Sequence, residues 1–202
     1  MVLAAALLLL AGCDGLLPGG QDGGAAPPAA PDRAQIDREG RSLLMARLLQ
    51  VGTTALMRPS GRNGDVVTWL SPDNISLSFA GGVLVATRGL GADLMSAEVT
   101  GTRRMLAGHE MPPRGYPRLH GRLDGEHRTQ FASYLCHEAG RRPETITLNG
   151  KERQTMRVTE RCTAPDIAFD NTYWLGRDGL IWQSRQWVGT VIGHLQTERL
   201  HR

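Results

Sequence analysis

The sequence predicts an antiparallel β fold with one N-terminal helix. Three observations support this fold class: short runs of β-branched and aromatic residues, tight turns rich in Gly, Asn and Asp between them, and one segment with helical spacing near the start. Residues 35–202 are long enough to form a single β-rich domain with a sizeable core. We find no internal repeat in the sequence.

The first segment, residues 1–12, is predicted to be a lipoprotein signal peptide. An unbroken apolar run from Met1 ends in Leu-Ala-Gly-Cys at Cys13, the lipobox that precedes a lipidated cysteine in bacterial lipoproteins. The run is shorter than the ~20 apolar residues of a transmembrane helix. No Lys or Arg precedes it, although export signals normally begin with positive charge, so we expect the natural start upstream of Met1. The alternative is an ordinary secretory signal with a chance cysteine.

Residues 13–34 are expected to form a lipidated flexible tether. Cys13 would attach the mature chain to the lipid bilayer, outside the cytoplasm. Gly15 to Pro31 consists mainly of Gly, Ala and Pro, which cannot bury a core. Fully extended, this stretch would reach up to about 50 Å from the membrane. Asp14 marks retention in the inner membrane of enteric bacteria, so the choice between the two membranes stays open.

The helix is predicted between Gly40 and Gly52. Arg41 and Arg47 fall on its polar side, and Gly52 supplies a C-terminal stop. The apolar residues that recur with helical spacing are Leu43, Leu44, Leu48, Leu49 and Val51.

The remaining segments are expected to be strands joined by turns. Strand patterns cover residues 66–70, 75–79, 83–85, 128–136, 146–148, 156–158, 169–175, 180–188 and 191–200. The last three of these form a meander with a turn from Gly176 to Gly179. Residues 105–123 are rich in Gly, Pro, Arg and His without clear periodicity, so they are expected to form a long loop.

The cysteine count predicts one disulfide. With Cys13 used for lipid, Cys136 and Cys162 remain as an even pair in an oxidising compartment. Closing a loop of about 26 residues is worth ~3.5 kcal/mol in the chain-entropy model. The alternative is two buried free thiols.

A hairpin at Asn149-Gly150 supports this disulfide, because the two cysteines lie almost symmetrically about it. The match is imperfect, since a two-residue turn would pair Cys136 with Thr163. Gly140 and Pro143 are also expected to interrupt the ladder between the strands. The sequence therefore predicts proximity of the cysteines but leaves their register open.

The charge pattern favours an acidic partner only weakly. The formal net charge is +3, and Lys151 is the only lysine. A GC-rich genome that favours arginine codons accounts for this on its own. Arginine also binds carboxylates and phosphates bidentately, which makes an acidic glycan a candidate partner. Nucleic acid is excluded by the predicted compartment.

Motifs for catalysis, metal binding or cofactor binding are not found in the sequence. It lacks a Gly-x-Ser-x-Gly elbow, a phosphate loop and a dinucleotide fingerprint, and the six histidines lack metal-ligand spacing. We therefore expect no enzyme activity, no metal and no cofactor. The alternative is a glycan-modifying enzyme with paired carboxylates; the acidic residues that could converge are Asp93, Glu98, Asp124, Asp170 and Asp178.

Two stretches are candidate recognition sites. Arg88 and Asp93 flank a Gly-rich loop after a strong strand; they either present a recognition loop or pair with each other in a structural corner. Trp182, Arg185 and Trp187 lie in the C-terminal meander, where an exposed indole could stack on a sugar. The two tryptophans have opposite strand parity, so we expect them on opposite faces, with either one exposed or both faces covered.

Four sequence blocks resemble those of the YjbF lipoprotein family, also called the GfcB or group 4 capsule lipoproteins. The blocks are residues 67–73, 82–95, 169–175 and 181–188, in this order between Arg41 and Leu200. The resemblance implies a mainly β domain, an antiparallel meander that forms a barrel-like or strongly curved sheet. It also implies a role in making or exporting extracellular polysaccharide, and it favours the outer membrane. It carries no established catalytic residues.

These observations together predict a periplasm-facing lipoprotein that assists exopolysaccharide or capsule secretion as a non-catalytic binding or scaffolding domain. Its expected partners are the bilayer, through Cys13, and polysaccharide-export or envelope proteins. The alternatives are the glycan-modifying enzyme, which requires converging carboxylates or a polar cleft, and an adaptor that contacts only partner proteins.

Overall fold

The computed structural model describes residues 42–200, except 124, 125 and 127. The predicted signal peptide, Cys13, Asp14 and the tether lie outside the described residues. Lipidation at Cys13 and the choice of membrane therefore stay predictions. No helix among the described residues combines the length and apolar character that crossing a membrane requires.

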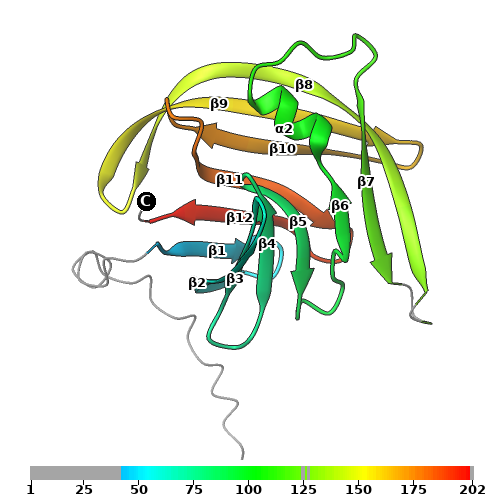
Figure 1. The fold of residues 1–202 in the computed structure, drawn as a ribbon, viewed down its shortest axis with the longest axis horizontal. Coiled ribbons are helices and arrows are strands. Elements are labelled where there is room, and N and C mark those ends of the chain that lie inside the picture. Colours follow the sequence, from blue (N-terminus) through cyan, green and yellow to red (C-terminus); the bar gives the residue numbers. More distant parts are fainter. Residues whose placement is uncertain (1–41, 124–125, 127, 201–202) are drawn as a thin grey trace, which may run out of the picture.

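The chain forms one antiparallel sheet that closes almost into a barrel (Figure 1), which confirms the predicted fold class. The sheet has 12 strands in the order β5-β4-β3-β2-β1-β12-β11-β10-β9-β8-β7-β6. The strands are β1 (Leu44–Leu48), β2 (Thr53–Asn63), β3 (Val66–Leu70), β4 (Ser76–Ala80), β5 (Val83–Arg88), β6 (Ser96–Glu98), β7 (Tyr116–Leu123), β8 (Thr129–Leu148), β9 (Lys151–Ala164), β10 (Ile167–Leu175), β11 (Ile181–Gly189) and β12 (Gly193–Arg199), and the helix is α2 (Thr100–Leu106).

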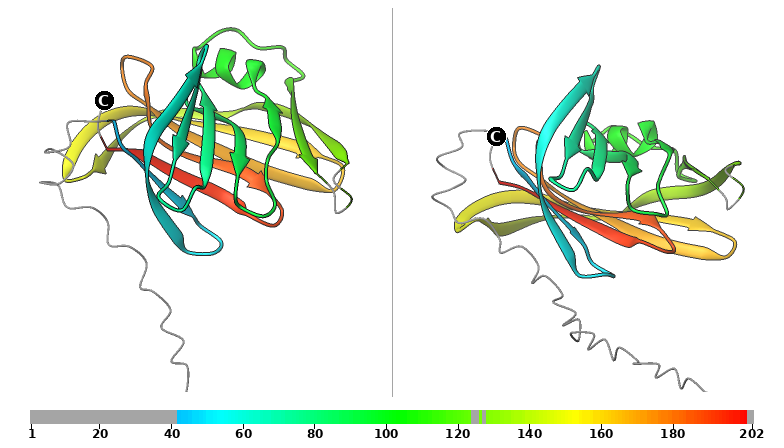
Figure 2. Two further views of the ribbon diagram at one scale, coloured as in Figure 1. Left: turned by 60° about the horizontal axis from the view of Figure 1, so that its bottom comes forward. Right: turned by 90° about the horizontal axis from the view of Figure 1, so that it is seen from below.

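The two ends of this strand order meet again at one corner. The Thr87 amide at the end of β5 donates to the Leu94 carbonyl just before β6, at 2.8 Å. Figure 2 shows β8 to β12 as a broad curved layer, with β3, β4, β5 and α2 lying over one side of it. The interior between these parts holds the apolar core.

The helix predicted between Gly40 and Gly52 is wrong, because this segment forms β1. Leu44–Leu48 pairs with β12 on one side and β2 on the other, so its backbone groups are satisfied within the sheet. Leu44 and Ala46 face the core, while Leu43 packs with Leu200 in a separate cluster. A short strand that buries apolar side chains on both faces has no alternation and is easily mistaken for a helix.

The long loop predicted over residues 105–123 is also wrong. It contains the end of α2 and all of β7, Tyr116–Leu123. The alternation in β7 is inverted: Arg118 and His120 are buried, whereas Leu119 is exposed. A pattern search that expects apolar residues inside does not detect such a strand.

The β8–β9 hairpin contains the predicted disulfide between Cys136 and Cys162. Asn149 and Gly150 both have positive φ, as a tight two-residue hairpin turn requires. A bulge between Glu138 and Gly140 shifts the register by one residue, so that Cys136 pairs with Cys162 instead of Thr163. The interruption expected at Gly140 is therefore correct.

Pro143 does not interrupt the ladder, because it stays in register opposite Met156. The predicted C-terminal meander is present as β10, β11 and β12. Its first turn is closed by a bond from the Gly179 amide to the Gly176 carbonyl, at 3.0 Å.

Candidate functional site

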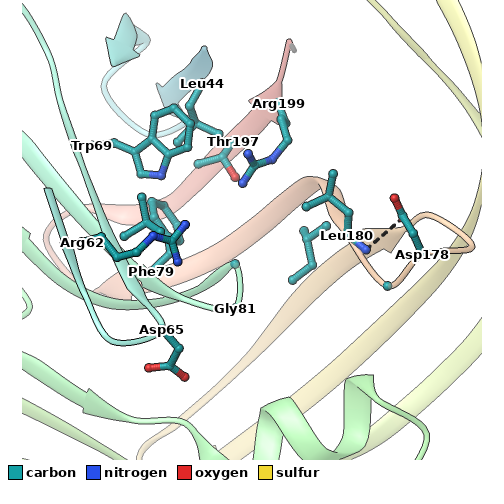
Figure 3. Close-up of a pocket in the computed structure, with 14 residues that line it drawn as sticks. Leu44, Arg62, Asp65, Trp69, Phe79, Gly81, Asp178, Leu180, Thr197 and Arg199 are labelled. Carbon is teal, nitrogen blue, oxygen red and sulfur yellow. Dashed lines mark hydrogen bonds between the residues drawn. The ribbon is translucent and has the colours of Figure 1, made fainter. Parts of the chain in front are cut away.

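A cleft of about 300 Å³ opens between the inner face of β2 to β4 and the turn that joins β10 to β11. The ends of β1 and β12 close its third side. Figure 3 shows the side chains around it. The lining residues are Leu44, Arg62, Asp65, Val67, Trp69, Phe79, Gly81, Gly82, Asp178, Gly179, Leu180, Ile181, Thr197 and Arg199.

One wall of the cleft is apolar. Trp69 on β3 and Phe79 on β4 point inward because they fall on the core-facing positions of neighbouring antiparallel strands. Both rings pack into the core and are only 3% and 5% exposed, so they reach the cleft by their edges, and the half-buried Val67 and Leu180 provide the accessible apolar surface. The wall is therefore held rigidly by the barrel.

Arg199 forms a second wall. Its position opposite Leu44 in the β1–β12 ladder turns the side chain inward, and its guanidinium carbon lies 5.3 Å from the centre of the Trp69 ring. Its Nε atom is buried and has no hydrogen-bond partner among the described residues. Burial lowers the pKa of Arg199, but a guanidinium stays charged at neutral pH.

Arg62 approaches from the opposite side, near the end of β2. Figure 3 shows the Arg62 and Arg199 guanidinium groups directed into the same opening. Within the described part of the chain, neither has a carboxylate partner. Two cations without a carboxylate partner therefore meet beside the apolar wall.

The two carboxylates of the cleft already serve structural contacts. Asp65, in the β2–β3 turn, forms an ion pair with Arg103 of α2. Asp178 accepts a hydrogen bond from the Leu180 amide at 3.2 Å and so holds the β10–β11 turn. The local charge available to a ligand is consequently positive.

The Gly81-Gly82 turn is fixed across the barrel by Gln186 on β11. The Gln186 amide donates to the Gly82 carbonyl at 3.0 Å and accepts from the Leu84 amide at 2.8 Å. A Cβ at Gly82, where φ is +87°, would lie 2.8 Å from Ile181 Cδ1. Only glycine allows this close approach beside the cleft.

A second polar cluster is sealed inside the barrel around Glu160. Its carboxylate accepts hydrogen bonds from five side chains: Thr102 at 2.5 Å, Tyr116 at 2.9 Å, Arg118 at 3.3 Å, Asn171 at 2.8 Å and Tyr173 at 3.3 Å. Glu160 and Arg118 are both fully buried. Burial and the Glu160 charge raise the pKa of both tyrosines, so they stay protonated as donors.

His120 extends this cluster as a neutral acceptor. Its Nε2 accepts from Arg118 Nε at 3.0 Å. Burial lowers the pKa of His120 to about 2, with help from the Arg118 and Arg122 charges. The cluster is an internal structural network, since none of its groups lines the cleft.

Cys136, Cys162 and Glu160 lie close enough together to suggest a metal site. The two sulfur atoms are bonded to each other, so they are not available as thiolate ligands. The described residues hold no other group of this kind.

The predicted Arg88–Asp93 pair is not formed. Asp93 instead accepts from the Thr87 hydroxyl at 2.7 Å and from the amides of Gly89 and Leu90 at 2.9 and 3.1 Å. The Arg88 guanidinium donates to three backbone carbonyls, those of Thr87, Leu94 and Met95. The stretch is a structural corner, as one of the two sequence interpretations held, but each residue stabilises it through backbone contacts.

Trp182 and Trp187 pack in two different clusters, and neither is exposed. The Trp182 ring is covered by Arg153, whose guanidinium carbon is 3.5 Å from its centre. Trp187 is half-buried and stacks on Phe169 with ring centres 5.4 Å apart. Arg185 is exposed on β11. None of the three lines the cleft, and their role in recognition stays a prediction.

Sequence reasoning placed Trp69 and Phe79 in strands but gave neither a role in binding. Arg62 and Arg199 carried no signal, because each is one of many arginines in the sequence. The cleft brings together residues from both ends of the domain, which no local pattern shows.

Comparison with known proteins agrees with the fold. The crystal structure of the hypothetical lipoprotein YmcC from Escherichia coli (K12) is similar with a TM-score of 0.67 and 23% identity, over 84% of this chain and 88% of that chain. No curated protein sequence matches the chain. The family described as "Group 4 capsule polysaccharide lipoprotein gfcB, YjbF" matches residues 14–200. Because this match spans nearly the whole chain, the protein belongs to the YjbF family of group 4 capsule polysaccharide lipoproteins.

Proposed function

We propose that this protein is a non-catalytic, periplasm-facing lipoprotein that binds extracellular polysaccharide in the cleft between Arg62 and Arg199 and so assists its secretion. Family membership supports the link to capsule polysaccharide. The lipobox at Cys13 supports a membrane anchor, with the outer membrane favoured by the family and the inner membrane by Asp14. The observation that carries the binding role is the meeting of two unpaired arginines with an apolar wall.

The chemistry of the cleft suits a sugar. The half-buried side chains of Val67 and Leu180, beside the edges of Trp69 and Phe79, offer apolar surface for the C–H side of a pyranose. The arginines offer up to five N–H donors each to hydroxyl or acidic groups. The volume of about 300 Å³ lies at the lower end of ligand pockets, which span roughly 300–1,000 Å³. A short piece of a polymer fits such a site better than a large cofactor.

The carboxylates support binding over catalysis. Glycoside hydrolysis needs two carboxyl groups free to act on opposite sides of the scissile bond. Asp65 is held by Arg103, and Asp178 holds its own turn. Neither is placed as a free acid or nucleophile.

Complementation of a deletion strain tests the proposal. The double variant Arg62→Gln/Arg199→Gln should lower secreted polysaccharide while leaving the amount of envelope-associated protein unchanged. Arg47→Gln is the matched control, because Arg47 is an exposed arginine on β1, outside the cleft. Normal secretion by the double variant would remove the cleft from the mechanism and leave the adaptor function in its place.

A further inference from the structure

We infer that the ligand of the cleft is a carboxylated sugar, with its carboxylate between Arg199 and Arg62 and its ring against the apolar wall that includes Val67 and Leu180. This inference rests on the proposed function and names its ligand class. It follows from three features of the cleft: a desolvated cation without a counter-ion, a second cation facing it, and an apolar wall beside both.

Arg199 is the centre of the argument. Its guanidinium is held against the Trp69 ring, which fixes its plane and removes part of its hydration. The buried Nε has no acceptor among the described residues, and burial lowers the pKa of the group. Because Nε is buried, a ligand reaches the guanidinium through its terminal N–H groups, and an anionic oxygen suits these best, since charge-assisted hydrogen bonds are the strong ones.

Arg62 provides the second contact. It faces Arg199 across the opening (Figure 3) and is exposed, so it can reach a ligand without first being desolvated. Asp65, a carboxylate that also lines the cleft, is already paired with Arg103. A carboxylate between two guanidinium groups would accept hydrogen bonds from both forks, whereas a neutral sugar would leave the two charges uncompensated.

The apolar wall distinguishes a sugar acid from a simple anion. Inorganic phosphate would satisfy the arginines but would make no use of Val67 and Leu180. A uronic acid offers the carboxylate and, on the same ring, a C–H face that packs against this wall. The arginines and the apolar wall then both contact the ligand.

Titration of the mature lipidated protein in detergent micelles tests this inference. The probes are glucuronate and galacturonate, with glucose, galactose and inorganic phosphate as comparisons, followed by calorimetry and saturation-transfer NMR. We expect the uronates to bind at least about tenfold more tightly than the neutral sugars, because two charge-assisted contacts are gained. They should also bind more tightly than phosphate and show saturation transfer to ring C–H protons.

Variants assign the effect to the cleft. Arg199→Lys keeps the charge but loses the fork and should weaken uronate binding by about tenfold. Arg62→Gln should also weaken it, while Arg47→Gln should bind as the wild type. Thermal melts of each variant show whether the fold is intact. Equal binding of glucose and glucuronate, phosphate binding as tight as uronate, or no uronate binding up to about 50 mM would each overturn the inference.

The outcomes separate this inference from the proposed function. Uronate binding with normal secretion by the cleft double variant would leave the ligand class standing and remove the role in secretion. Cleft-dependent secretion with equal binding of neutral sugars would keep the function and remove the ligand class.

Discussion

At the scale of single residues, Glu160 is the centre of a buried polar network inside the barrel. Glu160 lies on β9, and its carboxylate accepts five side-chain hydrogen bonds from α2, β7 and β10. It also forms the buried ion pair with Arg118. A buried charge of this kind is tolerated only when it is paired and hydrogen-bonded. This one carboxylate therefore connects the helix α2 with the strands β7, β9 and β10.

Glu160→Gln should destabilise the domain strongly. The amide removes the charge that compensates Arg118 and adds donors where five donors already converge. Breaking a buried pair by changing one partner typically costs about 3–5 kcal/mol in the free energy of unfolding. Denaturant unfolding measures the loss. Asp170→Asn is the control, since its pair with Arg161 is about half exposed and should contribute only about 0–1 kcal/mol. Similar losses in both variants would contradict the structural role of the network.

His120 should make the stability depend on pH. Its pKa is lowered to about 2 in the folded protein by burial and by neighbouring arginines, while the unfolded value is about 6.5. Below pH 6.5 the unfolded chain binds a proton that the folded protein excludes. The free energy of unfolding should therefore decrease as the pH is lowered below about 6.5, by up to about 1.4 kcal/mol per pH unit for this group.

Unfolding free energies at pH 7, 6 and 5 test this dependence. His120→Gln should reduce the pH dependence of the unfolding free energy in that range, because about one proton fewer is taken up on unfolding. His194, whose pKa is also lowered by burial, retains its own contribution in both proteins. An unchanged slope in the variant would show that His120 is not the source.

At the scale of elements, the β8–β9 hairpin is the longest pairing in the sheet and carries the disulfide. The bulge between Glu138 and Gly140 sets the register that brings Cys136 opposite Cys162. Turn, bulge and disulfide thus act on the same two strands. The hairpin in turn positions Glu160, on β9, in the buried interior of the barrel.

Loss of the disulfide should lower stability without changing the fold. Cys136→Ala/Cys162→Ala opens a loop with a sequence separation of 26 residues, and the chain-entropy model gives about 3.5 kcal/mol for such a loop. Denaturant unfolding of the exported protein, with and without reductant, measures it. The wild type should lose stability under reductant, whereas the double variant should not respond. Free alkylation of both thiols in the native wild type would contradict the bond.

The elements that the sequence predicts best are those with ordinary strand patterning. β3, the Asn149-Gly150 hairpin and the C-terminal meander have apolar residues inside and polar turns between them. β1 was misassigned because both of its faces are partly covered. β7 was missed because Arg118 and His120 point inward and Leu119 outward, an inversion that only the buried Glu160 network explains.

At the scale of the whole molecule, the cleft depends on the pairing of the first strand with the last. The β1–β12 ladder brings Arg62 on β2 and Trp69 on β3 near Arg199 at the end of β12. Local patterns cannot predict such a site, since its parts are separated by more than 100 residues of sequence. The family, in contrast, could be predicted from short ordered blocks, because these occur within single strands and turns.

The anchor and the cleft should be separable functions of the molecule. Cys13→Ser, expressed from the natural start, should abolish acyl labelling and leave unprocessed precursor, because the lipidated sulfur is lost. The β domain lies beyond the tether, so the purified variant should still bind glucuronate as the wild type does. Secretion of polysaccharide should nevertheless fall, since the domain is no longer presented at the membrane surface. Acyl labelling, cell fractionation and the uronate titration check the three parts. A lipid-labelled membrane species from the variant would show that the anchor assignment is wrong, and loss of uronate binding would show that cleft and anchor are not independent.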